Sequence, residues 1–449
     1  MSQQQQDVQF EKKLSPLGVW GLAIGAMIGW GCFVMPGDQL LPDAGPIGAT
    51  LGLILGACMI VIISFSYSYL ISKYPVSGGE FVYADTAFGK THAFLCGWFI
   101  SIAYWALIPM NGTAVGLVAR YLVPGPLQAV KLYEIAGWPV YLGELIVCIA
   151  AIVIIGVVNM RGVEAAGWFQ TAVAVGLVGS MLVIAAAVLM GGPDWSNLKP
   201  FFAPEKSALS SVFTIAALAP WAFVGFDCIP QASEEYSFSN KKTKALLISS
   251  ISVAALMYMI ANTATAIVEP WELFIAENSS WPTGAAIEQL IGTIGLILLA
   301  IAMLCGIVSG LNAFYLAGSR LLYSMAIAEA IPAPFGKLDP KYKVPRFGIM
   351  FMMILAIIAP FFGRQVLSWL VDMTAVGADM GFHLHHSVCL RHRSSCWRQE
   401  TGRHLLHRPL LRHLLHLPAH PAILARFPQP TGLGIPRGMA RARFHLLHG

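Results

Sequence analysis

Nine stretches without a charged side chain dominate this chain of 449 residues. They cover residues 14–37, 44–72, 93–119, 145–160, 165–193, 207–226, 245–268, 289–319 and 347–363. Most exceed the roughly 20 residues that an α-helix needs to cross a bilayer. Only 11% of all residues are charged, against about a quarter in an average soluble protein. Because a soluble fold does not ordinarily bury so many apolar helices in succession, the sequence predicts an all-α integral membrane protein. A tenth span begins near Val366.

Two of these stretches are interrupted at matching places by glycine and proline. Ile24–Pro36 reads IGAMIGWGCFVMP, and Trp221–Pro230 reads WAFVGFDCIP. Both residue types are unfavourable inside a helix, and backbone unwinds at membrane depth only where protein or a watery cavity satisfies it. The second break lies five spans after the first, so the two helices enter from opposite faces. Paired interrupted helices of inverted repeats point to the binding site of a secondary transporter.

Lysine and arginine predict the orientation. With the N-terminus (residues 1–15) in the cytoplasm, the inner loops of residues 1–380 hold 13 of these residues and the outer loops hold five. Positive charge is retained on the cytoplasmic side of membrane proteins. The polar start lacks a cleavable signal peptide. We therefore expect a multi-pass protein of the cytoplasmic (inner) membrane whose first span is its own insertion signal.

The composition changes abruptly near Phe382. Eleven of the 12 histidines follow that point, together with ten arginines and no lysine, whereas residues 1–380 contain 13 lysines and five arginines. The organisation predicted is a transporter core over 16–380 and an aberrant His/Arg/Leu-rich tail over 381–449, which a shifted reading frame would produce. The C-terminal helices are then truncated or replaced. The alternative is a metal-binding or nucleic-acid-binding extension.

Several motifs resemble the amino acid–polyamine–organocation superfamily of permeases, in style closest to its basic amino acid/polyamine antiporters and cationic amino acid transporters. They are Ile24–Gly31, Tyr74–Ala84, Trp221–Asp227 with Ala232–Glu235, and Leu316–Ala326. The resemblance implies the leucine-transporter fold, in which ten core helices form 5+5 inverted repeats with discontinuous helices 1 and 6. Two more helices normally follow. It also implies a transporter rather than an enzyme.

The breaks are the expected substrate site. Unwound amides and the positive end of a half-helix suit a carboxylate, and free carbonyls suit an ammonium. The resemblance places carbonyl contacts at Met27 and Val224 and carboxylate contacts at Trp30 and Gly31. The complete predicted set is Met27, Gly29, Trp30, Gly31, Leu107, Ile108, Trp221, Val224 and Gly225.

Alternatives remain open for several of these residues. The glycines could serve only close helix packing, and Trp221 could either pack or hold an amine by a cation–π contact. Trp30 replaces the small residue usual in the superfamily, so its ring would shrink or cover the pocket. Asn111 could bond a neighbouring helix, and in the eighth span Asn312 and Ser309 are polar candidates.

Asp227 is the predicted proton-coupling residue, because a carboxylate within a span is a functional hypothesis by default. The alternative is an acid at the cytoplasmic headgroups, beside Glu234 and Glu235. Cys305–Gly310 offers a single hydroxyl, which argues against the sodium site of related symporters. The lysine that some proton-coupled members carry in the fifth helix is missing from 165–193, and Leu177 lies near its expected place.

The sequence thus predicts secondary active transport of amino acids or related amines by alternating access, as an exchanger or with proton coupling. The partners expected are this small molecule, the bilayer and protons, with a homodimer compatible and no nucleic acid. No cofactor, metal site or catalytic motif is indicated. The alternatives are a sodium symporter of the same fold, a truncated permease without transport activity, and a channel, although neither a pore loop nor a ring of like charge is evident.

Overall fold

Each of the nine apolar stretches contains helix in the computed structural model, which describes residues 9–135, 137–277 and 281–363. The main helices are α1 (Pro16–Ile28), α2 (Gly31–Met35), α3 (Leu41–Lys73), α5 (Lys90–Leu122), α7 (Leu142–Met160), α8 (Val163–Met190), α9 (Ala208–Ala222), α11 (Thr243–Ala266), α14 (Thr293–Ile327) and α15 (Arg346–Ile358). The predicted tenth span and the aberrant tail lie outside the described residues.

Six helical segments of the described residues are long and apolar enough to cross a membrane. The longest runs from Pro16 to Lys73 and contains the first two predicted spans, while residues 208–222 and 346–362 form shorter apolar helices. The prediction of a helical, multi-pass membrane protein is therefore confirmed.

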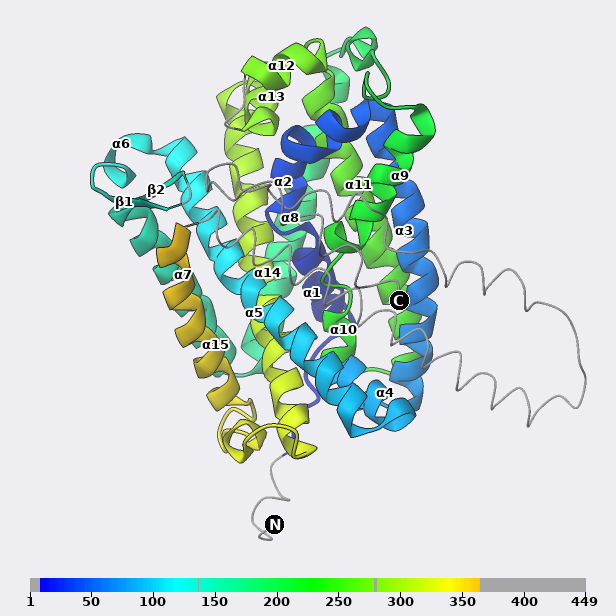
Figure 1. The fold of residues 1–449 in the computed structure, drawn as a ribbon, viewed down its shortest axis with the longest axis vertical. Coiled ribbons are helices and arrows are strands. Elements are labelled where there is room, and N and C mark those ends of the chain that lie inside the picture. The colour runs from blue at the N-terminus through cyan, green and yellow to red at the C-terminus, as the bar shows by residue number, and fades with distance from the viewer. Residues whose placement is uncertain (1–8, 136, 278–280, 364–449) are drawn as a thin grey trace, which may run out of the picture. The chain divides into compact units, whose positions relative to one another are not determined.

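Shorter elements connect these helices. They are α4 (Gly79–Phe88), α6 (Pro124–Leu127), α10 (Cys228–Gln231), α12 (Trp271–Glu277), α13 (Pro282–Ile291), the π-helical turn η2 (Pro36–Leu40) and the 3₁₀ turns η3 (Trp195–Leu198), η4 (Ser233–Glu235), η5 (Asn240–Lys242), η6 (Ala333–Gly336) and η7 (Ala359–Phe362). α12 and α13 lie at one end of the helices, and α4 lies at the other (Figure 1).

A small antiparallel hairpin departs from the purely helical prediction. Strands β1 (Lys131–Ile135) and β2 (Trp138–Tyr141) pair next to α6, with Ile135 opposite Trp138. The strands are rich in aromatic and β-branched residues, which favour extended backbone. Gly137 adopts a φ of 76° in the turn between the strands. The hydropathy pattern could not reveal this hairpin because it occupies a loop between spans.

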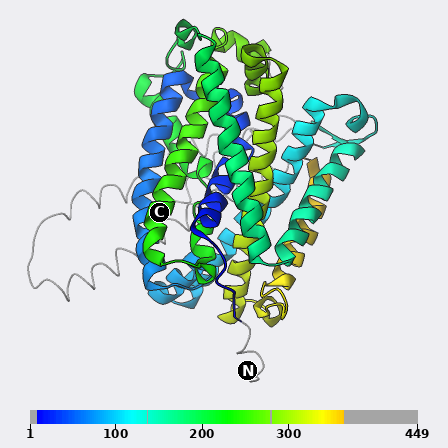
Figure 2. The same cartoon turned by 180° about the vertical axis from the view of Figure 1, so that it is seen from behind.

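α1 lies in the middle of the bundle when seen from either side (Figures 1 and 2). It packs against α8, α11, α14 and α10, and every residue from Gly21 to Ile28 is buried. α3 packs against α9 and α11, while α5 packs against α14. A helix that is apolar all round belongs in such an interior.

Both interrupted helices are broken at the glycines where the sequence predicted a break. α1 ends at Ile28, because Gly29 has a φ of 46° and a ψ of −139°, and α2 begins at Gly31. α9 ends at Ala222 and α10 begins only at Cys228, with Gly225 between them at a φ of 122°. Positive φ values of this kind are readily adopted only by glycine.

Candidate functional site

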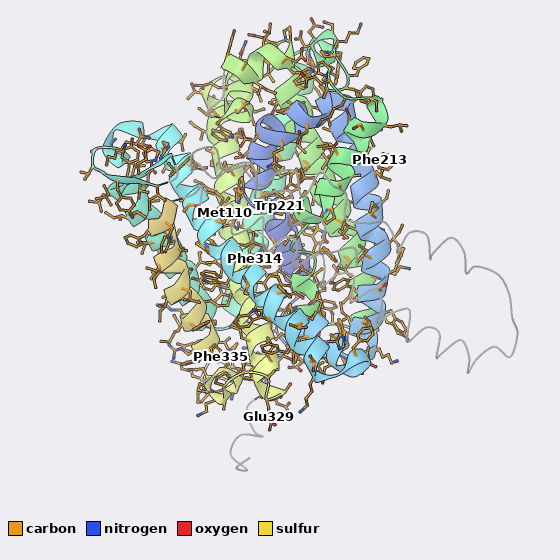
Figure 3. All side chains as sticks on the ribbon, viewed as in Figure 1. Met110, Phe213, Trp221, Phe314, Glu329 and Phe335 are labelled. Atoms are coloured by element: carbon orange, nitrogen blue, oxygen red, sulfur yellow. The ribbon has the colours of Figure 1, made fainter. Side chains whose placement is uncertain are left out.

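The two breaks open onto one cavity of about 530 Å³, part of which is open to solvent. Residues of α1, α2, α5, α9, α11 and α14 line it: Ala26, Met27, Ile28, Gly29, Trp30, Gly31, Ala103, Leu107, Asn111, Trp221, Ala222, Val224, Tyr258 and Phe314. Figure 3 shows Trp221 and Phe314 in the middle of the bundle. No charged side chain belongs to this lining among the described residues.

The walls formed by the two breaks touch each other. A Cβ atom on Gly225 would lie 2.3 Å from Cβ of Ala26 and 2.8 Å from its carbonyl carbon. The second break therefore approaches the backbone of α1 as closely as glycine allows. On the cavity side, the rings of Trp30 and Trp221 meet edge to face, with centroids 6.1 Å apart. Each break thus contributes one half-buried tryptophan to the cavity.

Met27 and Gly31 of the first break line the same cavity and carry backbone polar groups. The Tyr258 hydroxyl donates to the Met27 carbonyl at 3.3 Å. No side chain caps the start of α2, where the amides of Gly31 and Cys32 precede the first bonded one, that of Phe33. The cavity therefore offers carbonyl acceptors and amide donors within one short segment.

Asn111 adds an acceptor that the surrounding protein leaves unused. Its side-chain amide donates to the Leu107 carbonyl at 2.8 Å. Its Oδ1 atom is buried and receives no hydrogen bond from the described residues. An unsatisfied buried acceptor costs about 1–3 kcal/mol. A donor group on a bound molecule would remove this cost.

The structure brings most of the predicted site residues together. The cavity lining includes Met27, Gly29, Trp30, Gly31, Leu107, Trp221 and Val224. Ile108 is buried in the core instead, and Gly225 lies against Ala26. Sequence reasoning did not identify Tyr258, and it left the role of Asn111 open, because neither lies in a motif or near a break.

Comparison with known proteins gives a consistent family. A model of the amino acid permease family matches residues 14–416. The methylthioribose transporter of Bacillus subtilis (strain 168) is 25% identical over 388 residues, covering 84% of this chain and 81% of that protein. From the same organism, the branched-chain amino acid permease BcaP is 24% identical over 358 residues (75% and 71%), and the serine/threonine exchanger SteT is 25% identical over 359 residues (79% and 77%).

The chain belongs to the amino acid permease family. The resemblance drawn from the four motifs is thereby confirmed, and the relatives are transporters rather than enzymes. Cationic amino acid transporters are also among the proteins it resembles: the mouse cationic amino acid transporter 4 is 23% identical over 391 residues, covering 84% of this chain and 59% of that protein.

Asp227 of this permease is enclosed by protein. It immediately precedes α10 and is 3% exposed. Its Oδ1 accepts from the Gly225 amide at 2.8 Å, and its Oδ2 accepts from the Tyr104 hydroxyl at 2.6 Å. Asp227 does not belong to the cavity lining, so any effect on substrate passes through the break itself.

A second buried acid lies on α4. Glu80 is 1% exposed, and its Oε2 atom is 2.6 Å from Nε2 of Gln231 on α10. Burial raises the pKa of Glu80 to about 8, and the negative charge of Asp227 contributes to the rise. No sequence pattern predicts this contact, because Glu80 lies in a loop motif between two spans, where an acidic residue is common.

A network of neutral amides joins the permease's α1, α7, α8 and α14. Gln170 donates from Nε2 to the Gly21 carbonyl at 2.8 Å and to the Ser309 hydroxyl, and its Oε1 accepts from Asn312 at 2.7 Å. Asn312 in turn accepts from Asn159 at 2.8 Å. Gln170 of the fifth span thus forms hydrogen bonds to both the first and the eighth span, whereas Leu177 is a buried apolar residue next to Gly306.

A buried ion pair anchors the chain near the end of α14. Arg320 contacts Glu235 through two nitrogens, at 2.7 and 3.2 Å, and both side chains are 1% exposed. The Leu14 amide donates to the Glu235 carbonyl at 2.9 Å. The segment before α1, the turn η4 and α14 are therefore tied together on the side of α10 away from the break.

Proposed function

We propose that this permease carries a small neutral amino acid or a related amine across the membrane by alternating access. The supporting observation is the single cavity between two helix breaks, where backbone donors and acceptors remain available. A cavity whose described lining has no charged side chain favours a substrate with a neutral side chain. The names of the relatives, a branched-chain amino acid permease and a serine/threonine exchanger, are consistent with this class.

We assign the two ends of the substrate to different backbone groups. The carboxylate is bound by the amides at Trp30 and Gly31, and the ammonium by the carbonyls of Met27 and Val224. Asn111 Oδ1 supplies a further acceptor for the ammonium, since a buried acceptor without a donor favours a ligand that provides one.

The remaining predicted residues shape the site in this proposal. Leu107 and Trp221 contact the substrate side chain, Ile108 supports them from the core, and Gly29 and Gly225 permit the unwound backbone. Trp30 sets an upper limit on substrate size, because its ring already meets that of Trp221.

The architecture proposed is the 5+5 inverted repeat, with α1/α2 and α9/α10 as the equivalent discontinuous helices. Transporters of this type work by rocking one group of helices against the other around a fixed site. The N-terminus is cytoplasmic in this proposal, the membrane is the inner membrane, and a homodimer is compatible with it. The core is 16–380, and residues 381–449 are the product of a shifted reading frame.

For coupling, we propose substrate exchange or proton coupling through Asp227, without sodium. A sodium ion between the first and eighth spans would need the Gly21 carbonyl and the Ser309 hydroxyl as ligands. Gln170 already satisfies both with a neutral amide, and hard cations require oxygen ligands that are not otherwise engaged.

The test of the function is counterflow into proteoliposomes that contain the purified full chain. The labelled probes are serine, threonine, leucine, valine, lysine and methylthioribose. We expect saturable counterflow of a neutral amino acid, unchanged when choline replaces sodium. Flux without saturation would indicate a channel, a requirement for sodium would indicate the symporter, and a folded chain without any counterflow would indicate an inactive permease. Each of these outcomes overturns the proposal.

Asp227 is tested separately by its pH profile. Asp227→Asn mimics the protonated acid and removes the carboxylate charge from the break, so exchange should persist while its dependence on pH flattens. Glu272→Gln, at an exposed acid of α12, is the control and should keep the wild-type profile. A wild-type profile in Asp227→Asn would assign the coupling group elsewhere.

A further inference from the structure

Two carboxyl groups from distant parts of the chain are buried around α10 without a cation. Asp227 precedes α10, and Glu80 contacts Gln231 at its end. No ion pair of the described residues includes either acid. The buried cation of α14, Arg320, is already neutralised by Glu235, whose two carboxylate oxygens accept from two of its nitrogens. Two uncompensated charges cannot share such an interior, so at least one carboxyl group must be protonated.

The hydrogen bonds indicate which acid holds the proton. Asp227 accepts from two donors, the Gly225 amide and the Tyr104 hydroxyl, and such bonds favour the ionised form. Glu80 also has a favourable contact with the Tyr67 hydroxyl, but its burial and the charge of Asp227 outweigh it and raise the pKa of Glu80 to about 8. Its Oε2 atom lies 2.6 Å from Nε2 of the Gln231 amide. That distance is short for N–H···O and ordinary for O–H···O. If the Gln231 side-chain amide is flipped, so that Oε1 and Nε2 exchange places, a protonated Glu80 donates to Gln231 Oε1. In the unflipped orientation this oxygen has no hydrogen-bond partner among the described residues.

The other groups around Glu80 leave this assignment unchanged. Five neighbouring side chains interact electrostatically with Glu80: Tyr67 of α3, Tyr83 of α4, Cys96 and Tyr104 of α5, and Cys228 of α10. All are neutral acids that could not neutralise a second carboxylate. Phenols and thiols ionise only above the physiological range unless a cation is near.

We propose that Glu80 and Asp227 form one proton-binding site that fastens α4 to the second break. Glu80 carries the proton and Asp227 the negative charge. This inference rests on the proposed function, since it names the partner of Asp227 in coupling. When Glu80 releases its proton to solvent, its carboxylate forms beside that of Asp227. Repulsion between the two then separates α10 from α4.

The contact between the two segments is direct enough to respond to this change. A Cβ atom on Gly79 would lie 2.8 Å from Nε2 of Gln231. The Ser233 hydroxyl, just beyond α10, donates to the Val76 carbonyl at 2.8 Å. The start of α4 and the residues just before it therefore contact α10 and the residue that follows Ala232 directly, and movement of one affects the other. Because α10 continues from the second break, protonation is linked to the shape of the cavity wall.

Infrared spectroscopy of the purified full chain tests where the proton lies without any substrate. We expect a protonated-carboxyl C=O band that shifts in heavy water at about pH 6, well above the usual pKa of a glutamic acid. Glu80→Gln should lose this band, while Asp227→Asn and the exposed control Glu272→Gln should retain it. Loss of the band in Asp227→Asn with retention in Glu80→Gln would overturn the assignment.

Thermal unfolding provides the second measurement. The folded-state pKa of Glu80 lies near 8, above its unfolded value of about 4.3, so the folded protein binds more protons between these values. Its contribution to stability is complete at low pH and is lost as the pH rises towards 8. Glu80→Gln should therefore show a shallower fall of Tm over this window than wild type and Glu272→Gln. Equal slopes in all three would refute the site.

The two hypotheses fail in different ways. If counterflow is absent but the infrared band and the Tm slope depend on Glu80, the transport function fails and the proton site stands. If counterflow is present and neither measurement depends on Glu80, the proton site fails and the permease function stands.

Discussion

A single methyl group at the second break should weaken substrate binding strongly. In Gly225→Ala, the new Cβ atom would lie 2.3 Å from Cβ of Ala26 and 2.9 Å from the Met27 amide nitrogen. Ala26 and Met27 line the cavity, and the carbonyl carbon of Ala26, at 2.8 Å, and the Met27 nitrogen are backbone atoms with little freedom to move. The φ of 122° at Gly225 is a second obstacle, because side chains with the L configuration rarely adopt it.

The expected cost follows from these two terms. A residue other than glycine in a sparsely populated backbone region costs about 1–3 kcal/mol. Forcing a methyl group into a packed interior costs about 1–3 kcal/mol more. If the break relieves this strain by moving away from α1, the loss falls on the conformation that binds substrate. Since every 1.4 kcal/mol is about tenfold in affinity, Kd should rise by at least about 30-fold.

The assay is equilibrium binding of a labelled amino acid to the purified full chain, together with its thermal melt. Gly179→Ala is the matched control: this glycine is exposed on α8, has no heavy atom within 4 Å of a new Cβ and should leave Kd unchanged. Binding by folded Gly225→Ala within about threefold of wild type would refute the reasoning, because the two breaks would then not form one site.

Three further changes test separate parts of the structure. Trp30→Ala should enlarge the cavity and improve competition by larger amino acids about fourfold for each additional buried methylene, measured by displacement of a labelled substrate. Gln170→Leu should lower the free energy of unfolding by about 1–3 kcal/mol for each polar group left unpaired, without creating a response to sodium; a sodium-dependent thermal shift would contradict the role given to the amide. Glu235→Gln should lower the free energy of unfolding by about 3–5 kcal/mol because Arg320 becomes a buried charge without a counter-ion, and Glu235→Leu combined with Arg320→Met should recover most of it in thermal or denaturant unfolding.

The membrane helices and their breaks could be predicted from sequence because their causes are local. A charge-free run longer than about 20 residues has few alternatives to a membrane helix. Glycine at positive φ and proline without an amide proton interrupt a helix wherever they occur. The ends of α1 and α9 therefore fall where the sequence predicted them. The hairpin of residues 131–141 was not predicted, because it lies in a loop between two spans.

The contacts between distant segments were decided only by the tertiary structure. Gln231 and Glu80 are 151 residues apart, and Gln170 and Ser309 are 139 apart. Neither pair has a spacing that a helix or strand period would reveal. The same applies to Asn111, whose unused acceptor is apparent only once the bundle surrounds it.

Sequence therefore determined the helices, the position of the two breaks and, through its motifs, the permease family. It could not determine which polar groups the packed bundle would bury together, because the cost of burying a charge depends on neighbours from other helices. Asp227 could be singled out as an acid in an apolar segment. Its enclosure, its bond to Tyr104 and the second acid at Glu80 arise only when α4, α5 and α10 pack around one point.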